Sequence, residues 1–272
     1  MKEVYLMDIK QKNRESTLAR ELLSVERQEK KMEQATLKAK PAPWKKELES
    51  RIPEKVYTGL ESAFCKGFGV VFDQGRVIIE KCYDKGDLQA DHAIRDFAVK
   101  MKGGRKELKQ MHKSAKRSDL VNMAVTTVEG VGLGAMGVGM PDIVLFMGTL
   151  LKGVYETALS YGFEYESRQE QLLILKMMQT ALSSGEYWVQ RNVEVDEMLE
   201  LETIDITDDI FMQQMKDTAS AFAMDMLLLK FIQGLPVVGI IGGAANPVYY
   251  RKVMKYVQMK YRKRYLLKQK GL

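Results

Sequence analysis

Apolar residues recur at intervals of three and four along most of the chain, a pattern that predicts amphipathic helices. One helix is expected from about residue 50 to residue 83, with Phe64, Phe68 and Phe72 on a single face that packs into the core. The next is expected to begin at a capping Asp87. Its apolar residues repeat on one face, which is predicted to point inward: Ala90, Ile94, Phe97 and Met101.

Four further helices are predicted in the second half of the chain. They cover about residues 152–163, 171–183 and 210–231 and the C-terminal segment. Ser167 and Glu170 form a capping box before the second of these, and Thr207 opens the third. Two apolar stripes follow, Met212, Met215, Ala219, Phe222, Met226 and Leu229 on the third helix and Tyr250, Met254, Val257, Tyr261 and Tyr265 on the C-terminal one. The expected fold is all-α, a multi-helix globular domain.

The first forty residues predict a separate helical arm. Leu18, Leu22, Val25 and Met32 recur at helical spacing in a segment rich in charge, and prolines at 41 and 43 end it. The expected organisation is therefore a basic, mostly solvated helical arm at 1–43 and an all-helical domain at 44–272.

Two glycine-rich apolar stretches, residues 129–151 and 231–250, stand out from the helical pattern. Glycine at this density lets the backbone approach another helix, a phosphate or a lipid closely. Asp142 in the first stretch and two prolines in the second disfavour membrane-spanning helices. Both are therefore expected to form glycine-rich apolar helical hairpins, either buried in protein or dipping into a membrane surface.

The first stretch also contains a literal G-x-G-x-x-G, at Gly132, Gly134 and Gly137. A dinucleotide-binding fingerprint needs a helix directly after the glycines and an acidic residue about 20 positions further on. Pro141 interrupts that helix within one turn, and Glu156 lies on a helical pattern. Nucleotide binding is therefore not expected here.

Composition narrows the chemistry further. The only cysteines, Cys65 and Cys82, lie roughly 25 Å apart if their helix is unbroken, which fits a reducing compartment. With two histidines and no C-x-x-C motif, neither a metal nor a cofactor is expected. Catalytic motifs such as G-x-S-x-G and H-E-x-x-H are missing as well, so the protein is expected not to be an enzyme.

Each glycine-rich stretch is bordered by a basic segment. Residues 100–117 hold eight Lys/Arg and one Glu, and residues 251–270 hold nine Lys/Arg and no acid. In the first segment Leu108, Met111 and Ala115 line the face opposite the lysines. This composition is typical of an interfacial helix on anionic lipid, and it equally fits a solvated charged face. Tyrosines beside lysines in the second segment are expected to anchor it at an apolar boundary.

An acidic block at residues 186–209 holds nine carboxylates and one arginine. It lacks the order of ligands found in an EF-hand. A solvated acidic face and an intramolecular partner for one of the basic segments are both open interpretations.

The order of these parts resembles the EcsC family of bacterial proteins. The resemblance lies in Glu129-Gly130, the Gly-Met-Pro-Asp-Ile turn at 139–143, Tyr161-Gly162-Phe163, and the runs at 235–239 and 242–246. It covers roughly residues 44–268. It implies an all-helical cytoplasmic protein often found beside an ABC exporter, and it implies no catalytic mechanism.

The leading hypothesis is a non-enzymatic protein that binds anionic phospholipid at the inner face of the plasma membrane. The alternatives are a protein–protein adaptor for an ABC exporter and a tight helical core with solvated basic faces. No nucleic-acid partner is expected. The expected lipid-binding residues are Lys102, Lys106, Lys109, Lys113, Lys116, Gly130, Gly132, Gly134, Gly137, Gly139, Asp142, Gly239, Gly242, Gly243, Asn246, Arg251, Lys255 and Arg262.

Overall fold

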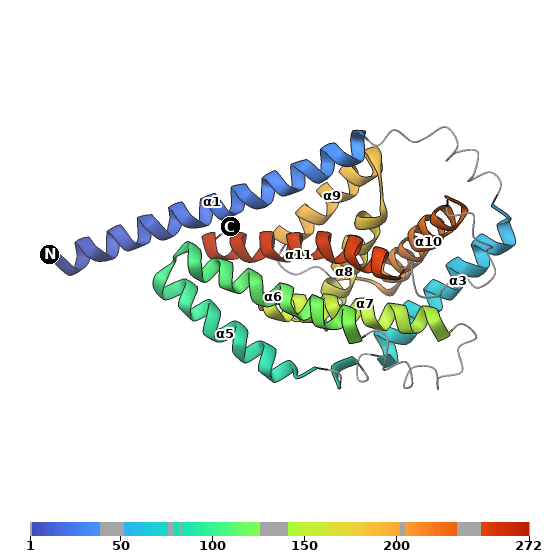
Figure 1. Cartoon of the computed structure of the whole chain (residues 1–272), viewed down its shortest axis with the longest axis horizontal. Coiled ribbons are helices and arrows are strands. Elements are labelled where there is room, and N and C mark those ends of the chain that lie inside the picture. Colours follow the sequence, from blue (N-terminus) through green and yellow to red (C-terminus); the bar gives the residue numbers. More distant parts are fainter. Residues whose placement is uncertain are drawn as a thin grey trace.

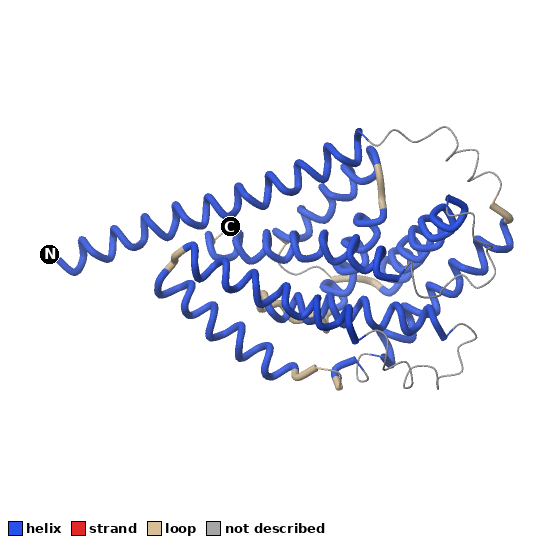
Figure 2. Tube along the Cα trace, viewed as in Figure 1, coloured by secondary structure: helices blue, strands red, loops and turns tan. Residues whose placement is uncertain are grey.

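The computed structural model describes residues 2–38, 52–75, 79–81, 83–125, 141–201, 205–232 and 246–271, and every regular element in these ranges is helical (Figures 1 and 2). The elements are α1 (Lys2–Lys38), α3 (Glu54–Val70), a π-helical turn η1 (Val71–Gly75), α5 (Lys85–Lys102), α6 (Arg105–Val125), α7 (Pro141–Ser160), α8 (Arg168–Leu182), α9 (Gly185–Glu200), α10 (Asp208–Ile232) and α11 (Asn246–Lys270). The predicted all-α fold is confirmed.

The core is built around α8 and α11, which pack against each other and are covered by the other helices (Figure 1). Nearly every side chain of α8 is buried. On one side α8 contacts α9 and α10, and α11 contacts α1, α6 and α7. None of the described helices is long and apolar enough to cross a membrane.

The predicted phenylalanine stripe of α3 is buried, as expected. Phe64 stacks on Phe222 of α10 with 5.3 Å between ring centroids, and Phe72 meets Phe211 edge-on at 5.7 Å. The helix is shorter than predicted, however, because it ends at Val70 and a π-helical turn follows. Glycines at positions 67, 69 and 75 weaken helix propensity there.

The predicted orientation of α5 is wrong. Ile94, Phe97 and Met101 are 70%, 65% and 63% exposed, and Ala90 is exposed too. The opposite, polar face packs inward, because Asp96 accepts hydrogen bonds from Tyr265 at 2.9 Å and from Gln269 at 2.7 Å. Helical periodicity correctly predicted that these residues share one face of α5. The further prediction that this face points toward the core is wrong.

Helix starts were predicted more accurately than helix faces. Ser167 Oγ accepts a hydrogen bond from the Glu170 amide at 3.1 Å, which confirms the cap of α8. Thr207 caps α10 through the Ile210 amide at 3.4 Å. For α5 the capping residue is Asp84, whose side chain accepts from the Asp87 amide, so the helix begins earlier than predicted.

The stripe predicted on α10 is buried over most of its length, with one exception. Met215, Ala219, Phe222 and Met226 are buried, whereas Met212 is 58% exposed in the first turns of the helix. The side chain of Leu229 lies outside the described residues.

Gly162 shows why the Tyr-Gly-Phe sequence at the end of α7 needs a glycine. Its φ is +77°, and a Cβ at this position would overlap the ring of His92. The His92 Nδ1 is 3.1 Å from the carbonyl oxygen of Ser160, which fixes α5 against the end of α7.

The predicted N-terminal helix forms, and it packs along α11 and α9 (Figure 1). Leu18, Leu22 and Val25 are buried and Met32 is half-buried. Its N-terminal end projects beyond the other helices. The predicted boundary at residue 43 lies outside the described residues and stays a prediction.

The two glycine-rich hairpins also remain predictions. Residues 126–140 and 233–245 lie outside the part of the chain that the structure describes. The helices that flank the first of them, α6 and α7, pack against each other.

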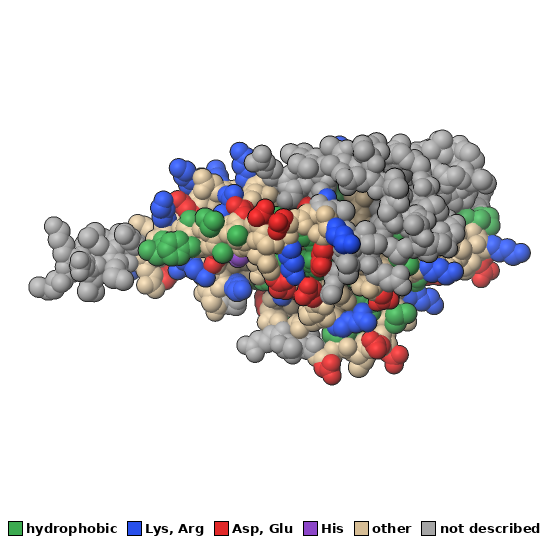
Figure 3. Space-filling model, turned by 90° about the horizontal axis from the view of Figure 1, so that it is seen from below, with side chains coloured by type: hydrophobic (Ala, Val, Ile, Leu, Met, Phe, Trp, Pro, Cys, Tyr) green, Lys and Arg blue, Asp and Glu red, His purple; other side chains and the backbone are tan. Residues whose placement is uncertain are grey.

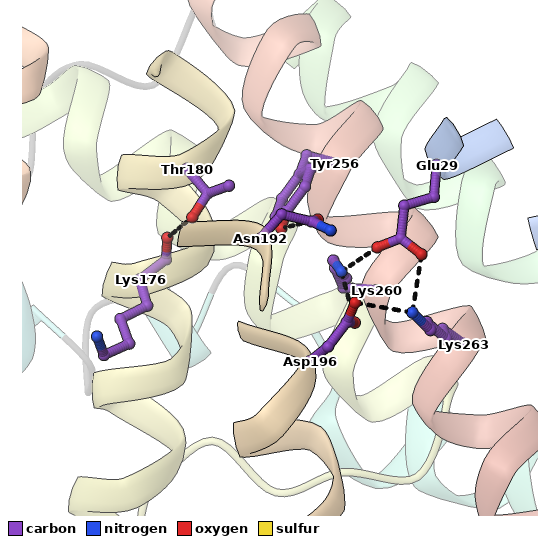
Figure 4. Close-up of polar contacts among 8 residues, drawn as sticks. All are labelled: Glu29, Lys176, Thr180, Asn192, Asp196, Tyr256, Lys260 and Lys263. Atoms are coloured by element: carbon purple, nitrogen blue, oxygen red, sulfur yellow. Dashed lines mark hydrogen bonds and ion pairs between the residues drawn. The ribbon is translucent and has the colours of Figure 1, made fainter. Parts of the chain in front are cut away.

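A buried cluster of charges ties α1 and α9 to α11 (Figure 4). The ammonium group of Lys260 is fully buried and donates to Glu29 of α1 and, at 2.6 Å, to Asp196 of α9. Lys263 lies 2.8 Å from Glu29 and 2.9 Å from Asp196. One member of the predicted acidic block is thus the intramolecular partner of the C-terminal basic segment.

We expect Glu29→Gln to lower the free energy of unfolding at pH 7 by about 3 kcal/mol, because it leaves buried lysines short of a counter-charge. Burial favours a high pKa for Glu29, but Lys260 and Lys263 lower that pKa from 4.5 to about 2. This contribution to stability is complete above pH 4.5 and is lost as the pH falls toward 2. Denaturant unfolding at several pH values measures it.

The matched control is Glu26→Gln, an exposed residue of the same helix, which should change stability little. The free energies of unfolding of Glu29→Gln and the wild type should converge as the pH falls. A difference that stayed constant from pH 7 down to pH 2 would contradict the stabilising role of the Glu29 carboxylate.

Candidate functional site

A cavity of about 260 Å³ lies where α1, α6 and α11 meet. Among the residues that the structure describes, its lining is basic, amide-bearing and apolar, and contains no carboxylate. It is formed by Gln28 of α1, His112 and Lys116 of α6, and Tyr250, Arg251, Met254, Lys255, Gln258, Met259 and Arg262 of α11. We call it the basic pocket.

The spacing along α11 places most of the lining on one face of that helix. Arg251, Lys255 and Arg262 are separated by four and seven residues, which brings them to the same side. The tyrosines of α11 serve the core, in contrast to the interfacial anchoring that was expected of them. Tyr261 and Tyr265 are buried, and the Tyr261 hydroxyl donates to Glu170 at 2.7 Å.

The cations of α11 fall into two groups according to their partners. Lys252, Lys260, Lys263 and Arg264 each pair with a carboxylate of another helix, Arg264 with Glu170 at 2.7 Å. In the pocket Arg262 pairs with Glu21 at 2.5 Å. Among the side chains that the structure describes, no carboxylate pairs with Lys116, Arg251 or Lys255. These three positive charges at the pocket therefore have no counter-charge within that set.

His112 lies at the same pocket, and its pKa is lowered. Burial, the charge of Arg262 and the charge of Lys116 together lower the pKa of His112 from 6.5 to about 3. At neutral pH the ring is therefore uncharged. Its Nδ1 is 2.7 Å from the hydroxyl of Tyr161, which fixes the orientation of the imidazole.

The rest of the lining is apolar and closely packed. Met254 and Met259 are buried members of the core as well as of the pocket wall. Tyr250 reaches α7 at Gly153, where a Cβ would overlap the phenol hydroxyl. A glycine at this position of α7 lets the Tyr250 ring settle against the helix.

The structure brings together four of the predicted site residues, Lys116, Arg251, Lys255 and Arg262. Lys102, Lys106, Lys109 and Lys113 are exposed and lie outside the pocket lining. Gly130, Gly132, Gly134, Gly137, Gly139, Gly239, Gly242 and Gly243 lie outside the described residues. Asp142 and Asn246 belong to the first turns of α7 and α11.

Sequence reasoning missed the neutral part of the lining. The 251/255/262 spacing contains Gln258 and Met259 on the same face, so helical periodicity was a usable signal for them. Gln28 carried no signal, because only the packing of α1 on α11 brings it to the pocket. His112 lies in the basic segment 100–117, and its residue type alone did not mark it as part of a binding site.

With this fold and pocket established, the class of protein can be stated: the chain belongs to the EcsC protein family, whose model matches residues 16–266. The match begins inside the segment predicted to be a separate arm. Among curated proteins the chain is similar to the protein EcsC of Bacillus subtilis (strain 168), with 30% identity over 142 residues. That alignment covers 51% of this chain and 57% of the Bacillus protein. No solved structure matches the chain.

We expect Lys116→Gln to raise the pKa of His112 by about one unit or less, because it removes one of the charges that disfavour the imidazolium. NMR titration of the two histidines measures this directly. Lys113→Gln, on the exposed face of the same helix, is the control and should leave the pKa of His112 in place. An unchanged pKa in Lys116→Gln would show that the charge of Lys116 does not contribute to the low pKa of His112.

Proposed function

We propose that this protein is a non-enzymatic peripheral membrane protein that binds the head group of an anionic phospholipid in the basic pocket. The observation that carries the proposal is the set of three cations, Lys116, Arg251 and Lys255, around a cavity whose described lining holds no carboxylate. Elsewhere on α11, buried cations are matched by carboxylates of neighbouring helices. An unmatched group of cations at a cavity favours an anionic ligand as the missing partner.

The size and lining of the pocket favour the polar end of an amphipathic molecule. A volume of about 260 Å³ is below that of a site that encloses a drug-sized ligand. It suits a phosphate with its glycerol, and the methionines and Tyr250 provide apolar contact beside the charges. A free phosphate would make no use of that apolar wall.

A second feature supports association with a charged surface. Lys106, Lys109 and Lys113 are exposed along α6, the helix that also carries Lys116. Lysines near an anionic leaflet contribute about 1 kcal/mol each, and salt screens this attraction. These three lysines, the lysine row of α6, would draw the protein toward the membrane, and the basic pocket would recognise the head group.

The pocket chemistry favours binding over catalysis. Its histidine is neutral at physiological pH and hydrogen-bonded to Tyr161, whose own pKa is raised by burial. Lysine and arginine side chains provide charge, and the glutamine amides provide hydrogen bonds.

An adaptor for an ABC exporter is the alternative, and lipid charge separates the two. An adaptor would bind its protein partner whatever the charge of the surrounding lipid. The proposed function requires binding to vesicles made of lipid alone.

We expect the triple variant Lys116→Gln, Arg251→Gln and Lys255→Gln to bind anionic vesicles about a hundredfold more weakly, at about 1 kcal/mol per cation. The measurement is co-sedimentation with phosphatidylcholine vesicles with and without phosphatidylglycerol. The matched control removes the same charge far from the pocket, as Lys55→Gln, Lys66→Gln and Lys216→Gln, all exposed on α3 and α10. Equal losses in both triples would mean that net charge, and not the pocket, governs binding.

Replacing Lys106, Lys109 and Lys113 by Glu should also abolish binding to anionic vesicles while leaving helicity intact, because all three are exposed. Binding of a water-soluble short-chain phosphatidylglycerol should survive in this variant and fail in the pocket triple. Circular dichroism and isothermal titration measure the two properties. If the row variant lost the soluble lipid and the pocket triple kept it, the pocket would not be the head-group site.

A further inference from the structure

Helix α5 presents an apolar stripe to solvent, while Val99 and several polar side chains face the protein. Ala90, Ile94, Phe97 and Met101 follow one another at intervals of three and four residues on the outer side. We call these four residues the outer face of α5. Figure 3 shows hydrophobic side chains gathered over this part of the molecule, with Lys and Arg side chains beside them.

The inner face of α5 is held by specific polar contacts, so the helix is not free to turn its apolar side inward. Asp96 accepts from Tyr265 and Gln269 of α11, and Asp91 accepts from Ser114 of α6 at 2.8 Å. Arg95 pairs with Asp91 at 2.6 Å. Ile94, Phe97 and Met101 are exposed, and no described part of the chain covers them. A contiguous apolar patch on a soluble protein marks an interaction surface.

Exposed charge differs between the two ends of α5, with cations near its C-terminal end and acids near its N-terminal end. At the C-terminal end, beside Phe97 and Met101, the exposed charges are Lys102 and Lys106, together with Lys100, which pairs with Asp96 at 2.6 Å, and Arg105, which lies 3.4 Å from Glu21. The carboxylate of Glu107 in this region turns back toward Gly104. At the N-terminal end Asp84 and Asp87 are exposed.

We propose that the outer face of α5 inserts into the boundary between head groups and acyl chains of an anionic membrane, an inference that rests on the proposed function. Phe97 and Met101 enter first, and Lys102 and Arg105 remain at the level of the phosphates. An apolar helical face with lysine and arginine at its border is the composition of an interfacial helix. The exposed acids keep the other end away from anionic lipid. The positive charge at the C-terminal end of α5 favours an anionic membrane, and not an apolar groove of another protein, as the partner of the outer face.

A fluorescent label at position 97 tests insertion directly. An environment-sensitive dye is attached to Phe97→Cys in a chain that also carries Cys65→Ser and Cys82→Ser. With phosphatidylcholine–phosphatidylglycerol vesicles we expect a blue shift and quenching by nitroxides on the acyl chains. The control carries the dye at Met212→Cys, an exposed position on α10, and should show neither change.

Substitution provides the second arm. Ile94→Asp with Phe97→Asp should weaken vesicle binding about tenfold or more while the affinity for soluble short-chain phosphatidylglycerol is unchanged. Both positions are exposed, so folding should be preserved. The matched control is Ile210→Asp with Met212→Asp, two exposed residues of α10, which should bind vesicles as the wild type does.

The outcomes separate this inference from the proposed function. Insertion is overturned if the protein binds vesicles while the dye at position 97 remains in water. It is also overturned if the variant with Ile94→Asp and Phe97→Asp binds vesicles as the wild type does. Neither result contradicts head-group binding in the basic pocket. If the dye inserts into neutral and anionic vesicles alike, the result supports insertion of the outer face of α5 and overturns the requirement for anionic lipid. Failure of the wild type to bind any vesicle overturns both. A dye at 97 that becomes shielded as protein concentration rises without vesicles shows that a second protein molecule covers the face, which also overturns insertion.

Discussion

The packing of this protein depends on neutralising the charge of α11. That helix carries nine Lys/Arg and no acid, yet it packs against α1, α6, α7, α8 and α9 and has a fully buried lysine, Lys260. A buried ammonium group without a partner costs several kcal/mol, so the helix can occupy the core only if carboxylates arrive with its neighbours. Glu29 comes from α1, Asp196 from α9 and Glu170 from α8.

The same constraint explains the character of the pocket. Where α11 meets carboxylates of α1, α8 and α9, its charges are paired. Along the face toward α6, Arg251 and Lys255 line the pocket together with Lys116 instead. Burial, the charge of Arg262 and the charge of Lys116 lower the pKa of His112 at the same pocket. One helix therefore provides both the structural cluster and the binding charges, and the presence of a neighbouring carboxylate distinguishes the two roles. The charge pattern of α5 follows a related logic, since Asp96 faces inward to tyrosine and amide donors of α11 while Ile94, Phe97 and Met101 face out.

Much of the fold could be predicted from the sequence, because helix periodicity and caps are local properties. The caps at Ser167 and Thr207 and the phenylalanine face of α3 are in place. The face of α5 could not be predicted, since an apolar stripe shows which residues share a side and not which side meets the core. The pocket was predicted only in part: the cations were identified by composition, whereas Gln28 reaches them through tertiary packing. The pairing of Asp196 with Lys260 and Lys263 is likewise a contact between distant segments that spacing alone does not reveal.

The most direct test of the central claim uses His112 as a probe inside the pocket. With only two histidines in the chain, its NMR signal can be followed while a short-chain phosphatidylglycerol is added below its micelle concentration. A phosphate bound among Lys116, Arg251 and Lys255 would offset their charge, so the pKa of His112 should rise from about 3 while the His92 signal stays in place. A His112 signal and pKa that do not respond to saturating anionic lipid would contradict head-group binding in the basic pocket.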